Sequence, residues 1–353
     1  MKKNNEHNNR KYGYIASNIS KRSLSSAIRQ DKYDRTMQET DGKTVPLHHT
    51  IIHTGVTYKV YDELKNVLCK NKIKRPLKRP LIIKENIFLA HEEDYKNDIV
   101  LIQFGPFTHP VETNKALAHM FYLDDNGSAH YLRAYNNNSS LNERLYFTED
   151  KNTAILMRVE HDKESEEDEQ FTIIWDNKYN GDYPGTDMFW QREERHDWSW
   201  VYAGPQDLHH ISFSFHPIYF NAYFIKDILN DIFDIPETNI EVSNSDYIPV
   251  DDDIATKIFN NSELKNYNYN IRNFDSDDFG LVYKAQECKD AYQSNLNRRY
   301  AIGIMYGKNK DGIGQVSNIF INGNLEIKIL NPQNGGIHYL KDWQYNIPYM
   351  ILF

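Results

Sequence analysis

Apolar positions repeat along the chain with two spacings, and each spacing predicts a different kind of element. Apolar side chains at i, i+4, i+7 and i+8 predict a helix over residues 56–70, because these positions share one helical face. Apolar side chains at i, i+3, i+4 and i+7 likewise predict a short helix over residues 225–233, which Pro236 ends. Further helices are expected over residues 251–259 and 281–296.

Short apolar or alternating runs, often rich in β-branched and aromatic residues, predict strands between these helices. Asp125-Asn126-Gly127 and Asn322-Gly323 have the residue types of hairpin turns, so we expect hairpins over 121–135 and 316–330. The other expected strands span residues 45–54, 81–90, 98–104, 153–159, 171–174, 209–219, 299–306 and 348–353.

Helices mixed with antiparallel strands predict an α/β (α+β) fold with antiparallel or mixed sheets, flanking helices and two possible lobes. We expect a main domain over residues 45–235 and a smaller C-terminal domain over residues 236–353. Residues 1–44 are polar and rich in Lys and Arg, so they predict a flexible basic arm.

Composition narrows the classes of function. The chain has 353 residues and a net charge of −9, which argues against a protein that coats DNA or RNA through many phosphate contacts. Its two cysteines form no disulfide framework and no zinc set, so we expect a reducing compartment and no metal or other cofactor. No signal peptide or membrane-spanning run is visible, which predicts a cytoplasmic protein or one exported without such a signal. The sequence does not indicate a protein partner.

Two histidine motifs suggest a catalytic site. In a strand, residues i and i+2 point to the same face, so His48 would stand beside Thr50, and His210 beside Ser212. If these strands were neighbours, one imidazole could act as general base and the other as general acid on a phosphodiester. The two hydroxyls would then bind the phosphate oxygens.

This pattern resembles the 2H phosphoesterase superfamily, whose members carry two His-x-Thr/Ser motifs. The resemblance implies a metal-independent phosphodiesterase, a hydrolase acting on a small nucleotide or an RNA end. His48, His210, Thr50 and Ser212 would be its catalytic residues. The alternative is that these histidines are ordinary strand residues, bonded to the backbone or to water.

A second resemblance lies in the C-terminal part. Cys288, followed by Gln315 and by Asn331 before Pro332-Gln333, is similar to the papain-fold toxin domains, in which a cysteine, a histidine and an aspartate form a triad. Gln315 stands in the place of the histidine, and glutamine cannot act as the base that forms a thiolate. The resemblance therefore implies an effector or toxin domain that has lost its catalysis.

A third interpretation rests on aromatic residues. Four of the five tryptophans lie within residues 175–200, among tyrosines and polar side chains. Such a stretch could form a stacking platform for a glycan or a nucleotide, with Trp190 and Trp198 as the ligand-binding residues. It could equally be a long loop held by large side chains.

Overall fold

The computed structural model describes twelve segments of the chain, of which the last covers most of its C-terminal half. They are residues 37–40, 43–46, 52–71, 86–94, 98–105, 117–123, 128–135, 143–162, 170–175, 187–194, 199–205 and 210–353.

The described chain is mainly β, so the predicted α/β class is wrong. Its three α-helices are α2 (Ala222–Phe233), α3 (Asp252–Asn261) and α4 (Ser276–Gln293). The 3-10 turns among the described residues are η2 (Glu92–Asp94), η3 (Lys151–Thr153), η4 (Glu237–Asn239), η5 (Leu264–Asn266) and η6 (Leu340–Asp342).

Residues 56–70 illustrate why the predicted α/β class is wrong. Instead of a helix they form β3 (Val56–Asp62) and most of β4 (Val67–Asn71), joined by a turn in which Lys65 has a φ of 63°. Apolar residues at this spacing also suit two buried strands. The β-branched Val56, Thr57 and Val60 favour that outcome.

Seven strands close into a barrel, because β14 pairs with both β11 and β3. In ring order they are β14 (Phe213–Asn221), β11 (Phe171–Trp175), β12 (Met188–Glu194), β13 (Ser199–Pro205), β5 (Asn86–Ala90), β4 and β3.

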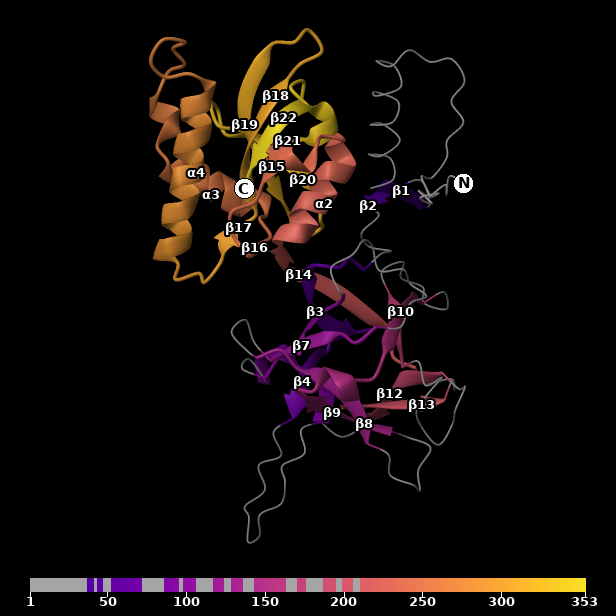
Figure 1. The fold of residues 1–353 in the computed structure, drawn as a ribbon. Helices are drawn as coiled ribbons and strands as arrows, with labels where there is room; N and C mark the ends of the chain where they lie inside the picture. Colours follow the sequence, from indigo (N-terminus) through magenta and orange to yellow (C-terminus); the bar gives the residue numbers. More distant parts are fainter. Residues whose placement is uncertain are drawn as a thin grey trace, which may run out of the picture.

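Further strands extend the barrel, which lies in the lower half of Figure 1. They are β6 (Leu101–Gln103), β7 (Met120–Tyr122), β8 (Tyr131–Tyr135), β9 (Glu143–Thr148) and β10 (Met157–His161). A separate ribbon pairs β1 (Met37–Thr40) with β2 (Lys43–Pro46).

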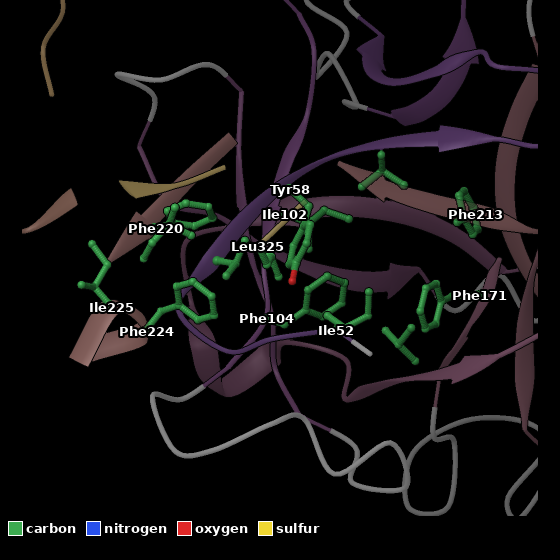
Figure 2. Packing of buried hydrophobic residues seen from close by; sticks show 14 of the residues in the cluster. Ile52, Tyr58, Ile102, Phe104, Phe171, Phe213, Phe220, Phe224, Ile225 and Leu325 are labelled. Atoms are coloured by element: carbon green, nitrogen blue, oxygen red, sulfur yellow. The ribbon is translucent and has the colours of Figure 1, made fainter. Parts of the chain in front are cut away.

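The barrel core consists of large apolar side chains on the inward face of each strand. Figure 2 shows Tyr58, Phe104, Phe171 and Phe213 gathered in this cluster. All four are nearly or fully buried, and the apolar surface that they remove from water stabilises the barrel. The same cluster continues into the C-terminal part through Leu325 and its neighbours.

The C-terminal part contains a six-stranded sheet. Its order is β15 (Ile240–Glu241), β22 (Ile347–Leu352), β18 (Ile302–Lys308), β19 (Gly314–Ile321), β20 (Ile327–Asn331) and β21 (Gly336–Tyr339). Helices α3 and α4 lie beside this sheet, as Figure 1 shows. They pack on one of its faces through a second apolar cluster. The opposite face joins the core that is continuous with the barrel.

Two short strands connect the two parts. Tyr247 of β16 (Asp246–Ile248) pairs with Phe220 of β14, so the barrel sheet extends toward the C-terminal helices. β17 (Arg299–Tyr300) then pairs in parallel with β16. None of the described helices is long and apolar enough to cross a membrane. The cytoplasmic location, the domain boundaries and the arm over residues 1–44 stay predictions.

Candidate functional site

A pocket of about 390 Å³ lies where β16, β17 and the C-terminal end of α4 meet. Polar and charged side chains form most of its lining, together with one aromatic ring and a thiol. The lining residues are Asn244, Ser245, Asp246, Cys288, Ala291, Tyr292, Leu296, Asn297, Arg298 and Arg299.

The pocket follows from how α4 ends. After Gln293 the chain turns at Asn295, which has a φ of 56°, a left-handed conformation that asparagine tolerates well. It then runs back beside β16, where Tyr247 pairs with Arg299 and the Ala301 N–H donates to the carbonyl of Ile248. This turn places residues 297–299 opposite Asp246.

Glu287 precedes the pocket residue Cys288 on α4, and its side chain is fully buried. One carboxylate oxygen accepts from the backbone N–H of Tyr300 at 3.1 Å. The other lies 3.1 Å from Lys284 Nζ and accepts from the Cys288 thiol at 3.5 Å. A buried carboxylate needs such partners, so Glu287 holds β17 against α4.

Arginine side chains dominate the electrostatics of the pocket. The guanidinium of Arg298 lies 3.9 Å from the ring centroid of Tyr219 on β14, a cation–π contact between the pocket and the barrel. Arg299 Nη1 lies 3.9 Å from the nearer Glu287 oxygen, beyond hydrogen-bond distance.

The opposite wall is acidic and polar. Asp246 Oδ2 accepts from the hydroxyl of Ser245 at 3.0 Å, and the Asn244 N–H donates to the Tyr247 hydroxyl at 2.9 Å. Burial raises the pKa of Tyr122 on the barrel, and the nearby carboxylate of Asp246 raises it further. The pocket therefore offers hydrogen-bond donors and acceptors on facing walls, which suits a small polar ligand.

Of the two histidine pairs predicted from the sequence, the structure describes His210 and Ser212, which do not line this pocket. His48 and Thr50 fall outside the described residues, so the distance between the two imidazoles is not defined. His210 Nε2 lies 3.3 Å from Oδ2 of the buried Asp162, and the Ser212 hydroxyl donates to the same oxygen. Both side chains thus tie the end of β10 to the segment before β14.

The predicted tryptophan platform is only partly described. Trp190 on β12 is 1% exposed, and its ring stacks on Phe121 in the barrel core with centroids 6.4 Å apart. It packs the barrel rather than facing a ligand at the surface. Trp198 lies outside the described residues.

Among the described residues, no three His, Cys, Asp or Glu side chains are grouped so that they could hold a metal ion. Cys288 lies near the C-terminal end of α4 and is half-buried, whereas Cys69 is fully buried in the barrel wall.

Comparison with known protein families matches one part of the chain. Residues 247–337, about a quarter of the chain, match the family model described as Agglutinin C-terminal. The matched segment contains α3, α4 and most of the pocket lining. No curated protein matches the chain.

Solved structures give weaker likenesses. The Polyporus squamosus lectin, bound to the epitope Neu5Aca2-6Galb1-4GlcNAc, matches 86% of this chain and all of its own at 16% identity, with a TM-score of 0.44. A PSL1a–E64 complex has the same coverage at 15% identity and a TM-score of 0.41. Trypsin inhibitor 1 from Senna obtusifolia matches 47% of this chain and 91% of its own at 12% identity, with a TM-score of 0.34.

These findings correct the predictions from the sequence. The agglutinin match and the mainly β fold overturn the resemblances to 2H phosphoesterases and papain-fold domains. The predicted phosphodiesterase, and the nucleotide or RNA end as its partner, are therefore wrong. The glycan-binding alternative agrees better with the match.

Proposed function

We propose that this protein binds carbohydrate and that the pocket between β16, β17 and α4 is its binding site. The observation that carries this proposal is the match of residues 247–337 to the Agglutinin C-terminal family. Agglutinins cross-link cells by binding the sugars on their surfaces. The matched segment supplies Tyr292, Asn297, Arg298 and Arg299 to the pocket.

The chemistry of the pocket fits a sugar. A sugar ring presents hydroxyls that both donate and accept hydrogen bonds, together with apolar C–H edges. Asp246 accepts, Arg299 donates, and Asn297 can do both. Tyr292 is 84% exposed at the pocket, so its ring is free to pack against the apolar edge of a sugar.

A glycan array probed with the full chain tests the function, and variants of the pocket test the site. Asn297→Ala and Tyr292→Ala each remove a side chain that the sugar would contact, so each is expected to weaken binding about tenfold. Tyr269→Ala is the control, because Tyr269 is also an exposed tyrosine but lies before the start of α4 and does not line the pocket. An array with no bound glycan contradicts the function. Glycan binding that both pocket variants leave unchanged contradicts the site.

A further inference from the structure

Exposed apolar side chains gather at the end of the C-terminal part that lies away from the barrel. Two connections of the chain reach this end, the one from α3 to α4 and the tip of the β18–β19 hairpin, as Figure 1 shows. Ile271 on the first is 74% exposed, and Ile313 on the second is 59% exposed. Tyr267 and Tyr269, on the same connection as Ile271, are about half exposed. A group of such side chains, unlike a single one, marks an interaction surface.

The turn that carries Ile271 is held in one conformation. Asn270 and Phe274 exchange backbone hydrogen bonds at 2.8 and 2.9 Å, and the Asn270 side chain accepts from the Arg272 N–H at 3.0 Å. The Phe274 ring stacks on Tyr267 with centroids 4.9 Å apart, and its edge packs against the α4 core. A preorganised turn therefore presents Ile271 to solvent.

The tip of the β18–β19 hairpin is built in the same way. Asn309 Oδ1 accepts from the backbone N–H groups of Asp311 at 3.0 Å and Ile313 at 2.8 Å. Gly312 between them has a φ of +84°, which glycine adopts without strain. Two turns on different elements thus each hold an isoleucine outward on a side-chain-bonded asparagine.

The two tips share one end because α4 begins beside β18 and β19. Gly280, in the second turn of α4, packs so closely on β19 that a Cβ there would lie 2.7 Å from the Val316 side chain. Burial raises the pKa of Tyr306 on β18, and Asp277 in the first turn of α4 raises it further. The Tyr306 ring lies 6.2 Å from that of Tyr349 on β22, so the exposed Tyr349 belongs to the same end.

This arrangement suits the interfacial region of a lipid bilayer better than a protein partner. Protein-binding sites bury a closely packed centre, whereas Ile271 and Ile313 stand on separate convex turns. Short apolar tips can enter the headgroup region, and tyrosine rings favour the depth at which apolar and polar surroundings meet. Lys308, whose Nζ lies 5.1 Å from the centroid of the Tyr349 ring, can extend its charge toward water from that depth.

Charge contributes little at this end of the molecule. The exposed cations Lys265, Arg272 and Lys310 are offset by the exposed carboxylates Glu263, Asp277 and Asp311. Anionic lipids attract surfaces with an excess of Lys and Arg, so these tips do not require them. The expected partner is a bilayer bound through its apolar interior edge, whatever the charge of its headgroups.

We propose that the turns at Ile271 and Ile313 insert into the interfacial region of a lipid bilayer, with the exposed tyrosines at the level of the headgroups. This surface is separate from the carbohydrate pocket, because it uses other residues at the opposite end of α4. Its ligand carries no sugar, so the two functions can be tested independently.

Co-sedimentation of the full chain with phosphatidylcholine vesicles, which carry neither glycan nor net charge, tests the proposal. We expect the wild type to bind these vesicles and added salt to leave the binding unchanged. Ile271→Ser combined with Ile313→Ser is expected to lower the partition coefficient about tenfold, because both apolar tips are lost.

Two further variants separate membrane contact from damage to the fold. Leu64→Ser is the control, because Leu64 is 61% exposed but lies on the turn between β3 and β4 of the barrel, and it is expected to change nothing. Ile271→Trp is expected to tighten binding severalfold, since tryptophan favours the bilayer interface, and misfolding cannot produce such a gain.

Three results would overturn the proposal. The first is a wild type that does not bind neutral vesicles, which would leave a protein as the partner of this end. The second is undiminished binding by the double serine variant. The third is binding that needs phosphatidylserine and disappears in salt, because charge and not apolar insertion would then hold the protein on the vesicle.

Discussion

The backbone N–H of Asn221 donates to the carbonyl of Gly55 at 2.8 Å, and this bond joins the segment that enters the barrel to the start of α2. The Asn221 side chain in turn caps α2 by accepting from the Phe224 N–H at 2.9 Å. Gly55 has a φ of +80°, and a Cβ there would lie 2.4 Å from Asn221 Oδ1. The barrel and α2 are therefore positioned by one contact that only glycine permits.

Gly55→Ala is expected to destabilise the protein by about 2–3 kcal/mol, because it adds a steric clash to backbone strain. Urea unfolding followed by circular dichroism measures the loss. Gly312→Ala is the matched control, since Gly312 has a φ of +84° but no atom within 4 Å of its added Cβ. The control should lose only about 1 kcal/mol from strain alone. Equal losses in the two variants would refute the contact with Asn221.

Glu287→Gln is expected to lower the free energy of unfolding by about 2–3 kcal/mol, because it leaves Lys284 without its carboxylate while the amide keeps the shape of the side chain. Equilibrium unfolding in urea measures the change. Asp253→Asn, at an exposed position in the first turn of α3, serves as the control, because loss of its interaction with the helix dipole should cost less than about 1 kcal/mol. A loss no larger than that of the control contradicts the anchoring role of Glu287.

His119 predicts a dependence of stability on pH. Burial lowers its pKa to about 4, although its Nε2 atom is bonded to the Met157 carbonyl. Below about pH 6.5 His119 becomes protonated in the unfolded state but stays neutral in the folded state. The contribution of His119 to stability therefore falls as the pH drops from 6.5 to 4. We expect the urea midpoint of His119→Phe to change less with pH over this range than the midpoint of the wild type. His91→Gln, at an exposed position, is measured beside it for comparison.

The two thiols are expected to react differently in the folded protein. Burial raises the pKa of Cys69 to about 12, and its side chain is fully buried, whereas Cys288 lines the pocket. A thiol reagent should modify one cysteine in the native chain and both in denaturant, as counted by mass spectrometry. Modification of Cys69 before Cys288 is the contrary result.

Local patterns predicted several elements correctly. The Asn322-Gly323 turn joins β19 to β20, with the Asn322 side chain accepting from the backbone of Asn324 and Glu326. The apolar spacing over residues 225–233 marks α2. Both features depend on neighbours in sequence, which is why the sequence displays them.

The barrel and the pocket depend on contacts between distant segments. Closure of the barrel requires β3 to pair with β14, and no local pattern specifies that partner. The pocket combines residues 244–246 with residues 288–299 through a parallel pair of two short strands. In the sequence, Cys288 stands out only as part of a supposed triad, and no pattern marks Arg298 and Arg299 as its neighbours in a pocket. The cavity forms because β17 pairs with β16, a contact between segments far apart in the sequence.

The rate of Cys288 alkylation, measured with and without a saturating glycan chosen from the array, tests the central claim most directly. Carbohydrate in the pocket would cover the thiol, so we predict a severalfold slower reaction with glycan and no change with a non-binding glycan. Alkylation at the full rate while the glycan is bound would contradict the pocket as the binding site.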